Sequence, residues 1–284
     1  MADPKPKDIV DMASADGSTL NRRTFFKRAS IAGGSVLAMG GLLSMATAQE
    51  QDENQTSTAA GITGGDQKIL IAAEIAEALA VTTYTNIINH APFFERLPED
   101  DQGYLKAARQ EEMSHYLLEE SVTNEPSPFT SFFYPEKMFE DAQTTLNVLV
   151  TLEDAFIAAY LVGVRGFSSA DFKVTAARIM GIESDHRTLA RVVAGDVSPV
   201  DGGPITRVTG IQGVAEPANP PNNNGYERTL CWSQISQAVT ALTPFVDVTA
   251  AKGAGFDTTK SFKFRPFTPH LPSNLGEFIS FTGC

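Results

Sequence analysis

The stretch EEMSHYLLEE, residues 111–120, places a glutamate and a histidine three residues apart in a segment whose pattern predicts a helix. Glu112 and His115 therefore share one helix face, because side chains at positions i and i+3 lie above one another. Apolar Leu105 and Ala108 flank that face. The spacing predicts that both polar side chains point into a core, where each needs a partner.

The same glutamate–histidine pair occurs a second time, in IESDH, residues 182–186. The predicted helix before each pair also carries a glutamate at an inward position, followed seven residues later by a tyrosine. The chain therefore repeats one plan. Its two halves are Glu77, Tyr84, Glu112 and His115, and Glu153, Tyr160, Glu183 and His186.

Charge gives this repeated plan a chemical meaning. When the two halves face one another, four carboxylates and two imidazoles converge, and bare carboxylates in a bundle core are very costly. Two divalent cations would neutralise them. Oxygen-rich ligands with one imidazole per ion suit iron or manganese better than metals that prefer sulfur. The predicted ligands of two iron or manganese ions are Glu77, Glu112, His115, Glu153, Glu183 and His186.

Other acidic residues lie close to the plan. Glu74 competes with Glu77 as a ligand, since it lies three residues earlier on a nearby face of the same helix. We favour Glu77 because its spacing to the following tyrosine repeats the spacing in the other half. The remaining glutamates of the opening stretch are expected to be surface charges: Glu111, Glu119 and Glu120.

The two tyrosines are predicted to support the ligands rather than to bind metal. Each lies two turns beyond its own glutamate, about 10 Å along the helix axis, which is too far for ligation. A core aromatic ring with a satisfied hydroxyl group is the alternative role. Two aspartates stand beside ligands in sequence but point about 100° away around the helix. The candidates for hydrogen bonds behind the ligands are Tyr84, Tyr160, Asp154 and Asp185.

Long helical segments dominate the middle of the chain, and a set of four predicts an all-α four-helix bundle. The expected helices span residues 67–89, 100–121, 141–166 and 169–194. Asp66 is the expected N-cap of the first helix. Three prolines exclude a continuous helix within residues 122–140.

The chain from residue 196 onward is rich in turn-forming residues and predicts an irregular extension. One short helix is expected near residues 232–242, and short strands are expected near 261–264 and 278–281. The many phenylalanines of this extension indicate that it packs on the bundle.

The six predicted ligands match the pattern of the ferritin-like di-metal carboxylate superfamily, in which two helices each give a glutamate and two each give a Glu-x-x-His pair. The sequence resembles that superfamily over residues 67–194. The segments LEDAFIAAY, residues 152–160, and IESDH look like the branch that includes desiccation-related proteins. The resemblance implies that the second and third helices run parallel, joined by a crossover through residues 122–140.

The N-terminal region is typical of an export signal. NRRTFFK, residues 21–27, precedes an apolar run over 31–45 and the small residues ATA at 46–48. This order resembles the bacterial twin-arginine signal, from which Asn21 and Phe26 are mild departures. The resemblance implies export of the folded protein by the twin-arginine translocase, to the periplasm or beyond. The predicted organisation is a signal peptide over 1–48, a flexible linker over 49–66, the bundle over 67–195 and the packed extension over 196–284.

The net charge of −12 limits the partners of this 284-residue chain. Nucleic acid and anionic membranes both repel an acidic chain. The N-terminal apolar run is also shorter than the roughly 20 residues of a membrane span, so no stable membrane anchor is expected. The two cysteines, Cys231 and Cys284, are too few for a disulfide scaffold or a cysteine-based zinc site, and whether they pair is open.

Two functions are compatible with these patterns. The predicted centre would bind O₂ or peroxide, and would oxidise Fe(II) or remove peroxide in stress protection. Alternatively, the bundle is a non-enzymatic desiccation or stress protein in which metal is structural or absent. A closed iron-storage shell is disfavoured, because a long irregular tail does not suit a compact shell subunit. Iron and manganese both fit the ligands, and the oligomeric state is open.

Overall fold

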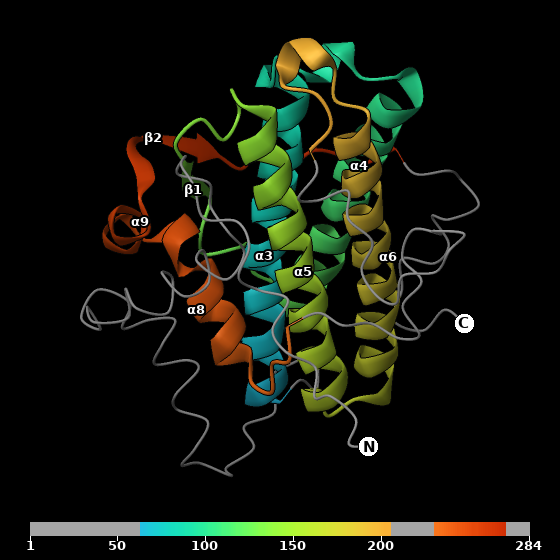
Figure 1. The fold of residues 1–284 in the computed structure, drawn as a ribbon. Helices are drawn as coiled ribbons and strands as arrows, with labels where there is room; N and C mark the ends of the chain where they lie inside the picture. Colours follow the sequence, from blue (N-terminus) through green and yellow to red (C-terminus); the bar gives the residue numbers. More distant parts are fainter. Residues whose placement is uncertain (1–62, 206–229, 271–284) are drawn as a thin grey trace, which may run out of the picture.

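The computed structural model describes residues 63–205 and 230–270. Four long helices form the bundle, and each begins and ends within three residues of its predicted bounds (Figure 1). They are α3 (Gly64–His90), α4 (Glu99–Thr123), α5 (Ala142–Gly166) and α6 (Ala170–Gly195). The helices α3 and α4 pack as one hairpin, and α5 and α6 as the other. The predicted all-α bundle is therefore confirmed.

Hydrogen bonds at the two ends of the bundle fix the direction of its helices. At one end, the backbone N–H of Ser168, between α5 and α6, donates to the Asp66 carboxylate at the start of α3 over 2.8 Å. At the other end, Arg96, just before α4, donates to Asp201, just after α6, over 2.7 Å. The start of α3 thus meets the end of α5, so α4 and α5 run parallel, as the resemblance implies.

The crossover that this arrangement requires is short but extended. Residues 124–141 return along α5, which has 25 residues, and β1 (Ser131–Pro135) lies within this segment. An extended chain reaches about 3.3 Å per residue, whereas a helix rises about 1.5 Å. The crossover therefore spans the bundle without a helix of its own.

Side-chain caps begin three of the bundle helices. The Asp141 carboxylate accepts the Thr144 N–H at 2.8 Å before α5, and Ser169 caps α6. The predicted cap of α3 is wrong. Thr63 is the N-cap, and its hydroxyl accepts from the backbone N–H of Asp66. The Asp66 carboxylate is buried and is used instead to hold the α5–α6 connection.

The described part of the extension forms two helices and one strand: α8 (Ile235–Val246), α9 (Val248–Ala254) and β2 (Phe256–Lys263). The helix α8 lies a few residues beyond its predicted bounds, and α9 is additional. The strand β2 overlaps the predicted strand near 261–264 and pairs antiparallel with β1, with Phe132 opposite Phe262. The second predicted strand, the signal peptide and Cys284 lie outside the described residues.

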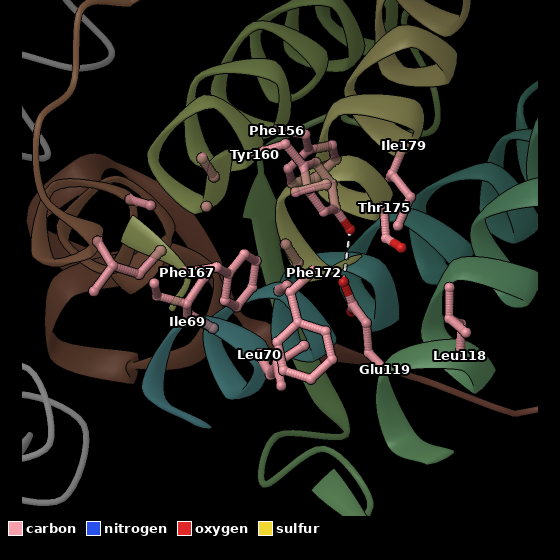
Figure 2. A pocket seen from close by; sticks show the side chains of 18 of the residues that line it. Ile69, Leu70, Leu118, Glu119, Phe156, Tyr160, Phe167, Phe172, Thr175 and Ile179 are labelled. Carbon is pink, nitrogen blue, oxygen red and sulfur yellow. Dashed lines mark hydrogen bonds between the residues drawn. The ribbon is translucent and has the colours of Figure 1, made fainter. Parts of the chain in front are cut away.

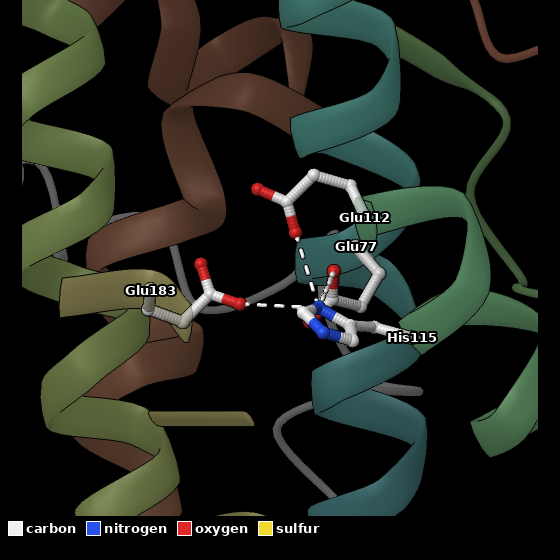
Figure 3. A group of neighbouring side chains, drawn as sticks. All are labelled: Glu77, Glu112, His115 and Glu183. Carbon is white, nitrogen blue, oxygen red and sulfur yellow. Dashed lines mark ion pairs between the residues drawn. The ribbon is translucent and has the colours of Figure 1, made fainter. Parts of the chain in front are cut away.

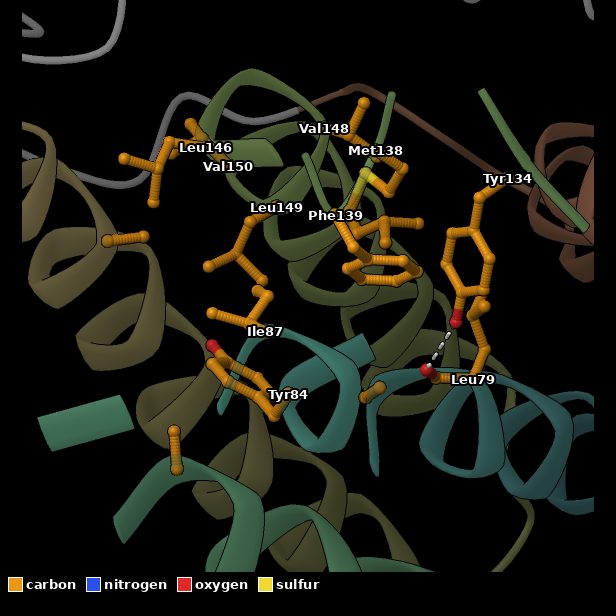
Figure 4. Close-up of a cluster of buried hydrophobic side chains, with 14 of the residues drawn as sticks. Leu79, Tyr84, Ile87, Tyr134, Met138, Phe139, Leu146, Val148, Leu149 and Val150 are labelled. Carbon is orange, nitrogen blue, oxygen red and sulfur yellow. Dashed lines mark hydrogen bonds between the residues drawn. The ribbon is translucent and has the colours of Figure 1, made fainter. Parts of the chain in front are cut away.

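The buried Tyr134 of β1 attaches this two-stranded sheet to the bundle (Figure 4). The Tyr134 ring of β1 lies edge-on to Phe139 and Phe262, with centroids 4.9 and 5.4 Å away. The Tyr134 hydroxyl is 3.0 Å from the hydroxyl of Thr83 on α3. The crossover and the extension are thus held on one core.

The helix α5 is long and apolar enough, by length and composition alone, to cross a membrane. Most of it is buried inside the bundle, as is usual for a central helix of a globular core. At its middle stand two fully buried carboxylates, Glu153 and Asp154. A buried charge in such a helix needs a partner, and this requirement leads to the site.

Candidate metal centre

All six predicted ligands come together at the middle of the bundle. They form two groups, and within each group the ligand atoms all lie within 4.8 Å of one another. Figure 3 shows the first group, drawn from α3, α4 and α6. The carboxylates are buried, and only 12 % of the His115 side chain is exposed. The groups are Glu77, Glu112, His115 and Glu183, and Glu112, Glu153, Glu183 and His186.

Glu112 and Glu183 belong to both groups, and each points one oxygen toward each histidine. The Oε2 of Glu112 lies 3.4 Å from His115 Nδ1, and its Oε1 lies 3.1 Å from His186 Nδ1. The Oε1 of Glu183 lies 3.2 Å from His115 Nδ1, and its Oε2 lies 3.6 Å from His186 Nδ1. The two carboxylates therefore stand between two positions and can bridge them.

The donor atoms of the cluster fit two cations. Within the described part of the chain, eight of its buried atoms lack a hydrogen bond of acceptable geometry. They divide into four for each position, namely one glutamate oxygen, one histidine nitrogen and one oxygen from each bridging carboxylate. Buried polar atoms without partners are costly and rare. The eight atoms are Glu77 Oε2, His115 Nδ1, Glu153 Oε2, His186 Nδ1 and both oxygens of Glu112 and Glu183.

The two tyrosines cross between the halves of the repeat. Tyr84 donates its hydroxyl to Glu153 Oε1 at 2.6 Å, and Tyr160 donates to Glu77 Oε1. Each tyrosine is too far from the glutamate of its own helix, as expected, and holds the glutamate of the other half. The tyrosine occupies one oxygen of the carboxylate and leaves the second for the centre.

The two aspartates expected behind the ligands differ in position. Asp154 is buried and accepts a hydrogen bond from Arg187 at 2.9 Å, which links α5 to the residue after His186. Asp185 is exposed on the outside of α6. It therefore cannot support the ligands from behind, because the α6 positions that face the core are those of Glu183 and His186.

Two residues of the opening stretch correct the sequence-based expectation. Glu119 is buried, and its Oε1 lies 2.8 Å from the Tyr160 hydroxyl, so it is not a surface charge. Its position seven residues after Glu112 is the available signal, since i and i+7 share a helix face. Glu111 is 40 % exposed, yet its Oε2 lies 2.8 Å from His186 Nε2. This contact crosses between helices, and no spacing within α4 indicates it.

Two further glutamates lie outside the cluster. Glu120 is partly exposed and accepts from the Tyr116 hydroxyl at 3.2 Å. Glu74 is buried and accepts from the Thr123 hydroxyl at 3.0 Å. The structure thus brings Glu77, rather than Glu74, to the histidines.

Without metal, protons balance the charges of the cluster. Burial and the charges of the bridging glutamates raise the pKa of Glu77 and Glu153 well above the usual value. Burial alone would lower the pKa of the histidines, but the facing carboxylates outweigh it and raise the pKa of both. Burial would raise the pKa of Glu112, but the two histidines lower it. Cations that bind here must therefore displace protons.

Comparison with known proteins agrees with this geometry. Residues 65–196 match the family model described as a ferritin-like domain. The searches of curated proteins and of solved structures found no match. The matched range begins with α3 and ends with α6. The four-helix bundle of this chain, with the glutamate–histidine cluster at its centre, therefore has the ferritin-like fold.

Proposed function

We propose that the cluster holds two iron or manganese ions and that this centre oxidises Fe(II) or removes peroxide. The observation that carries the proposal is the sharing of Glu112 and Glu183 between two positions, each with four buried donor atoms that lack a hydrogen bond of acceptable geometry. Four carboxylates neutralise two divalent cations, and their oxygens with one imidazole per ion suit iron and manganese. When bound, such an ion pair supplies electron exchange with O₂ or peroxide.

The chain's own polar residues prepare the centre in two ways. Tyr84 and Tyr160 fix the outer oxygens of the two unshared glutamates. Glu111 holds the Nε2 of His186, so the Nδ1 of that ring faces the cluster. Such hydrogen bonds orient a metal-binding histidine and strengthen its affinity.

Apolar side chains also keep bulk water away from the cluster. Met113, beside Glu112, and Ile157, one turn after Glu153, are fully buried. A dry surrounding strengthens every electrostatic interaction inside the site.

We extend the proposal to the place of action. The twin-arginine-like segment at residues 21–27 supports export of the folded, metal-loaded protein to the periplasm or outside the cell, in a role related to stress or desiccation. Subcellular fractionation of the native host tests the proposed export. Full-length protein that stays in the cytoplasm would contradict it.

The second candidate function is non-enzymatic. It is supported by the distribution of the ligands over the helices. The six ligands come from all four bundle helices, so bound metal would hold the bundle together. The two functions differ in turnover. A structural metal raises the midpoint of thermal unfolding but gives no oxidation of Fe(II) and no loss of peroxide.

Metal analysis of natively produced protein is the decisive experiment. We expect about two iron or manganese ions per chain, and oxidation of added Fe(II), or loss of peroxide, after reconstitution. The Glu112→Ala variant should lose both the metal and the activity, whereas Glu120→Gln, on the same helix, should keep both. Protein with all ligands intact that takes up neither metal would refute the proposal.

A further inference from the structure

A small apolar cavity lies next to the centre, between α3, α4, α5, α6 and α8 (Figure 2). Its volume is about 30 Å³. Alanine, glycine, isoleucine, leucine and phenylalanine side chains line it, and its polar lining residues are Glu119, Tyr160 and Thr175. The sequence patterns give no indication of such a space.

The cavity is connected to the ligands through one side chain. The Tyr160 hydroxyl lies 2.8 Å from Glu119 Oε1 and also bonds Glu77, a ligand. In Figure 2 the dashed line between Tyr160 and Glu119 marks this polar end. The Tyr160 side chain therefore borders the cavity and at the same time contacts Glu77, a predicted ligand.

Size and polarity limit what the cavity accepts. A water molecule needs about 10 to 15 Å³ of such volume and two to four polar partners. The polar end of the cavity is largely used up by the Tyr160–Glu119 bond. Glu119 Oε2 is the oxygen of this pair that lacks a hydrogen bond among the described residues. Glu119 Oε2 and the Thr175 hydroxyl are at most two partners for a guest, which is the lowest number that a water needs, and the rest of the lining is apolar. Apolar cavities of this kind stay dry and take up apolar gas.

We propose that this cavity binds dioxygen and passes it to the centre. The inference rests on the proposed function and selects dioxygen, rather than peroxide, as the oxidant that this route serves. Dioxygen has no hydrogen-bonding groups to leave unpaired, whereas hydrogen peroxide has two O–H donors that would be lost. Polar reactants have a different approach, because Glu111 is 40 % exposed and touches His186. Within the described chain, neither of these two residues lines the cavity.

Xenon binding tests the cavity without any activity measurement. Metal-free protein should bind xenon, seen as a xenon site in a pressurised crystal or as a ¹²⁹Xe chemical-shift change. Ala176→Leu, which fills the cavity from α6, should abolish it. Ala250→Leu, a buried alanine on α9 away from the cavity, is the matched control and should leave it unchanged. Ile235→Ala enlarges the cavity from α8 and should therefore tighten xenon binding. This variant tests the cavity if Ala176→Leu does not fold.

Kinetics then tests the delivery of dioxygen. In the iron-loaded protein, Ala176→Leu should raise the KM for O₂ several-fold and leave the rate with hydrogen peroxide unchanged. Absence of xenon from the parent protein, persistence of xenon in Ala176→Leu, or an unchanged KM for O₂ would overturn the inference. Equal losses with O₂ and peroxide would overturn it too, because they indicate a damaged centre. Loaded protein that binds xenon yet consumes neither oxidant refutes the proposed function and leaves only a gas-binding cavity.

Discussion

The two halves of the centre contain the same types of candidate ligand, but the residues that surround these ligands differ. In the first half, Glu77 is held by Tyr160, and Glu119 touches the same tyrosine. In the second half, Glu153 is held by Tyr84, and the position four residues after His186, which corresponds to Glu119, is Ala190. The repeat thus keeps the donor atoms of the two candidate metal positions the same, while the residues behind them differ.

Glu111, the carboxylate that contacts His186, likewise has no counterpart in the other half of the repeat. Glu111 precedes Glu112 on α4 and contacts His186 Nε2, whereas Ile182 precedes Glu183 on α6. Both additional carboxylates, Glu111 and Glu119, therefore come from α4. A repeated ligand plan with unequal support predicts two metal positions that differ in affinity.

The largest expected effect is on metal content, which should fall further when a shared ligand is removed than when an unshared one is. Glu112→Ala should abolish binding of both ions, because this side chain serves both groups. Glu77→Ala should remove one ion and retain the other. Metal content per chain after dialysis, measured by mass spectrometry, checks this. An equal loss in the two variants would mean that the positions are not independent.

A smaller effect is expected from the residue that holds His186. Glu111→Gln should weaken the ion at the His186 position about 10- to 100-fold, because hydrogen-bonded partners of this kind tune metal affinity by that factor. Titration with Mn(II), followed by calorimetry, measures it. Glu120→Gln is the control, since this partly exposed neighbour on α4 contacts Tyr116 instead. Equal affinities in both variants would show that Glu111 is only a surface charge.

The tyrosines offer a direct comparison of the halves in stability. Tyr160→Phe removes hydrogen bonds to two buried carboxylates, and Tyr84→Phe removes a bond to one. An unsatisfied buried group costs about 1 to 3 kcal/mol, so Tyr160→Phe should be the more destabilising in metal-free protein. Urea unfolding at neutral pH measures both. Adding Glu119→Leu should recover part of the stability that Tyr160→Phe loses, and should not recover the stability that Tyr84→Phe loses.

The convergence of the six candidate ligands was predictable from the sequence because a repeated spacing is a strong constraint. Glu112 and His115 lie on one helix face, and the second half repeats them, so periodicity alone brings all six side chains inward. The strand β1 was not predictable in this way, since its partner β2 lies more than 100 residues later. The contact of Glu111 with His186 also depends on how two helices cross. Local patterns report faces of helices, whereas contacts between distant elements require the packed structure.

The smallest expected effect concerns Glu74, which again has no counterpart in the second half. It lies three residues before Glu77, and the equivalent position before Glu153 is Val150. Burial raises the pKa of Glu74 to about 7, despite its hydrogen bond with Thr123.

The folded protein therefore holds a proton on Glu74 that the unfolded chain releases near pH 4.5. Its stability should decline as the pH rises from about 4.5 to about 7, because the unfolded state binds fewer protons over that window. Glu74→Gln cannot titrate, so it should remove this decline and stabilise the protein by about 1 kcal/mol at pH 8 relative to pH 4.5. Urea unfolding at the two pH values measures the difference, with exposed Glu136→Gln as the control. A pH dependence that is the same in both variants would place Glu74 in contact with water rather than in the core of the first half.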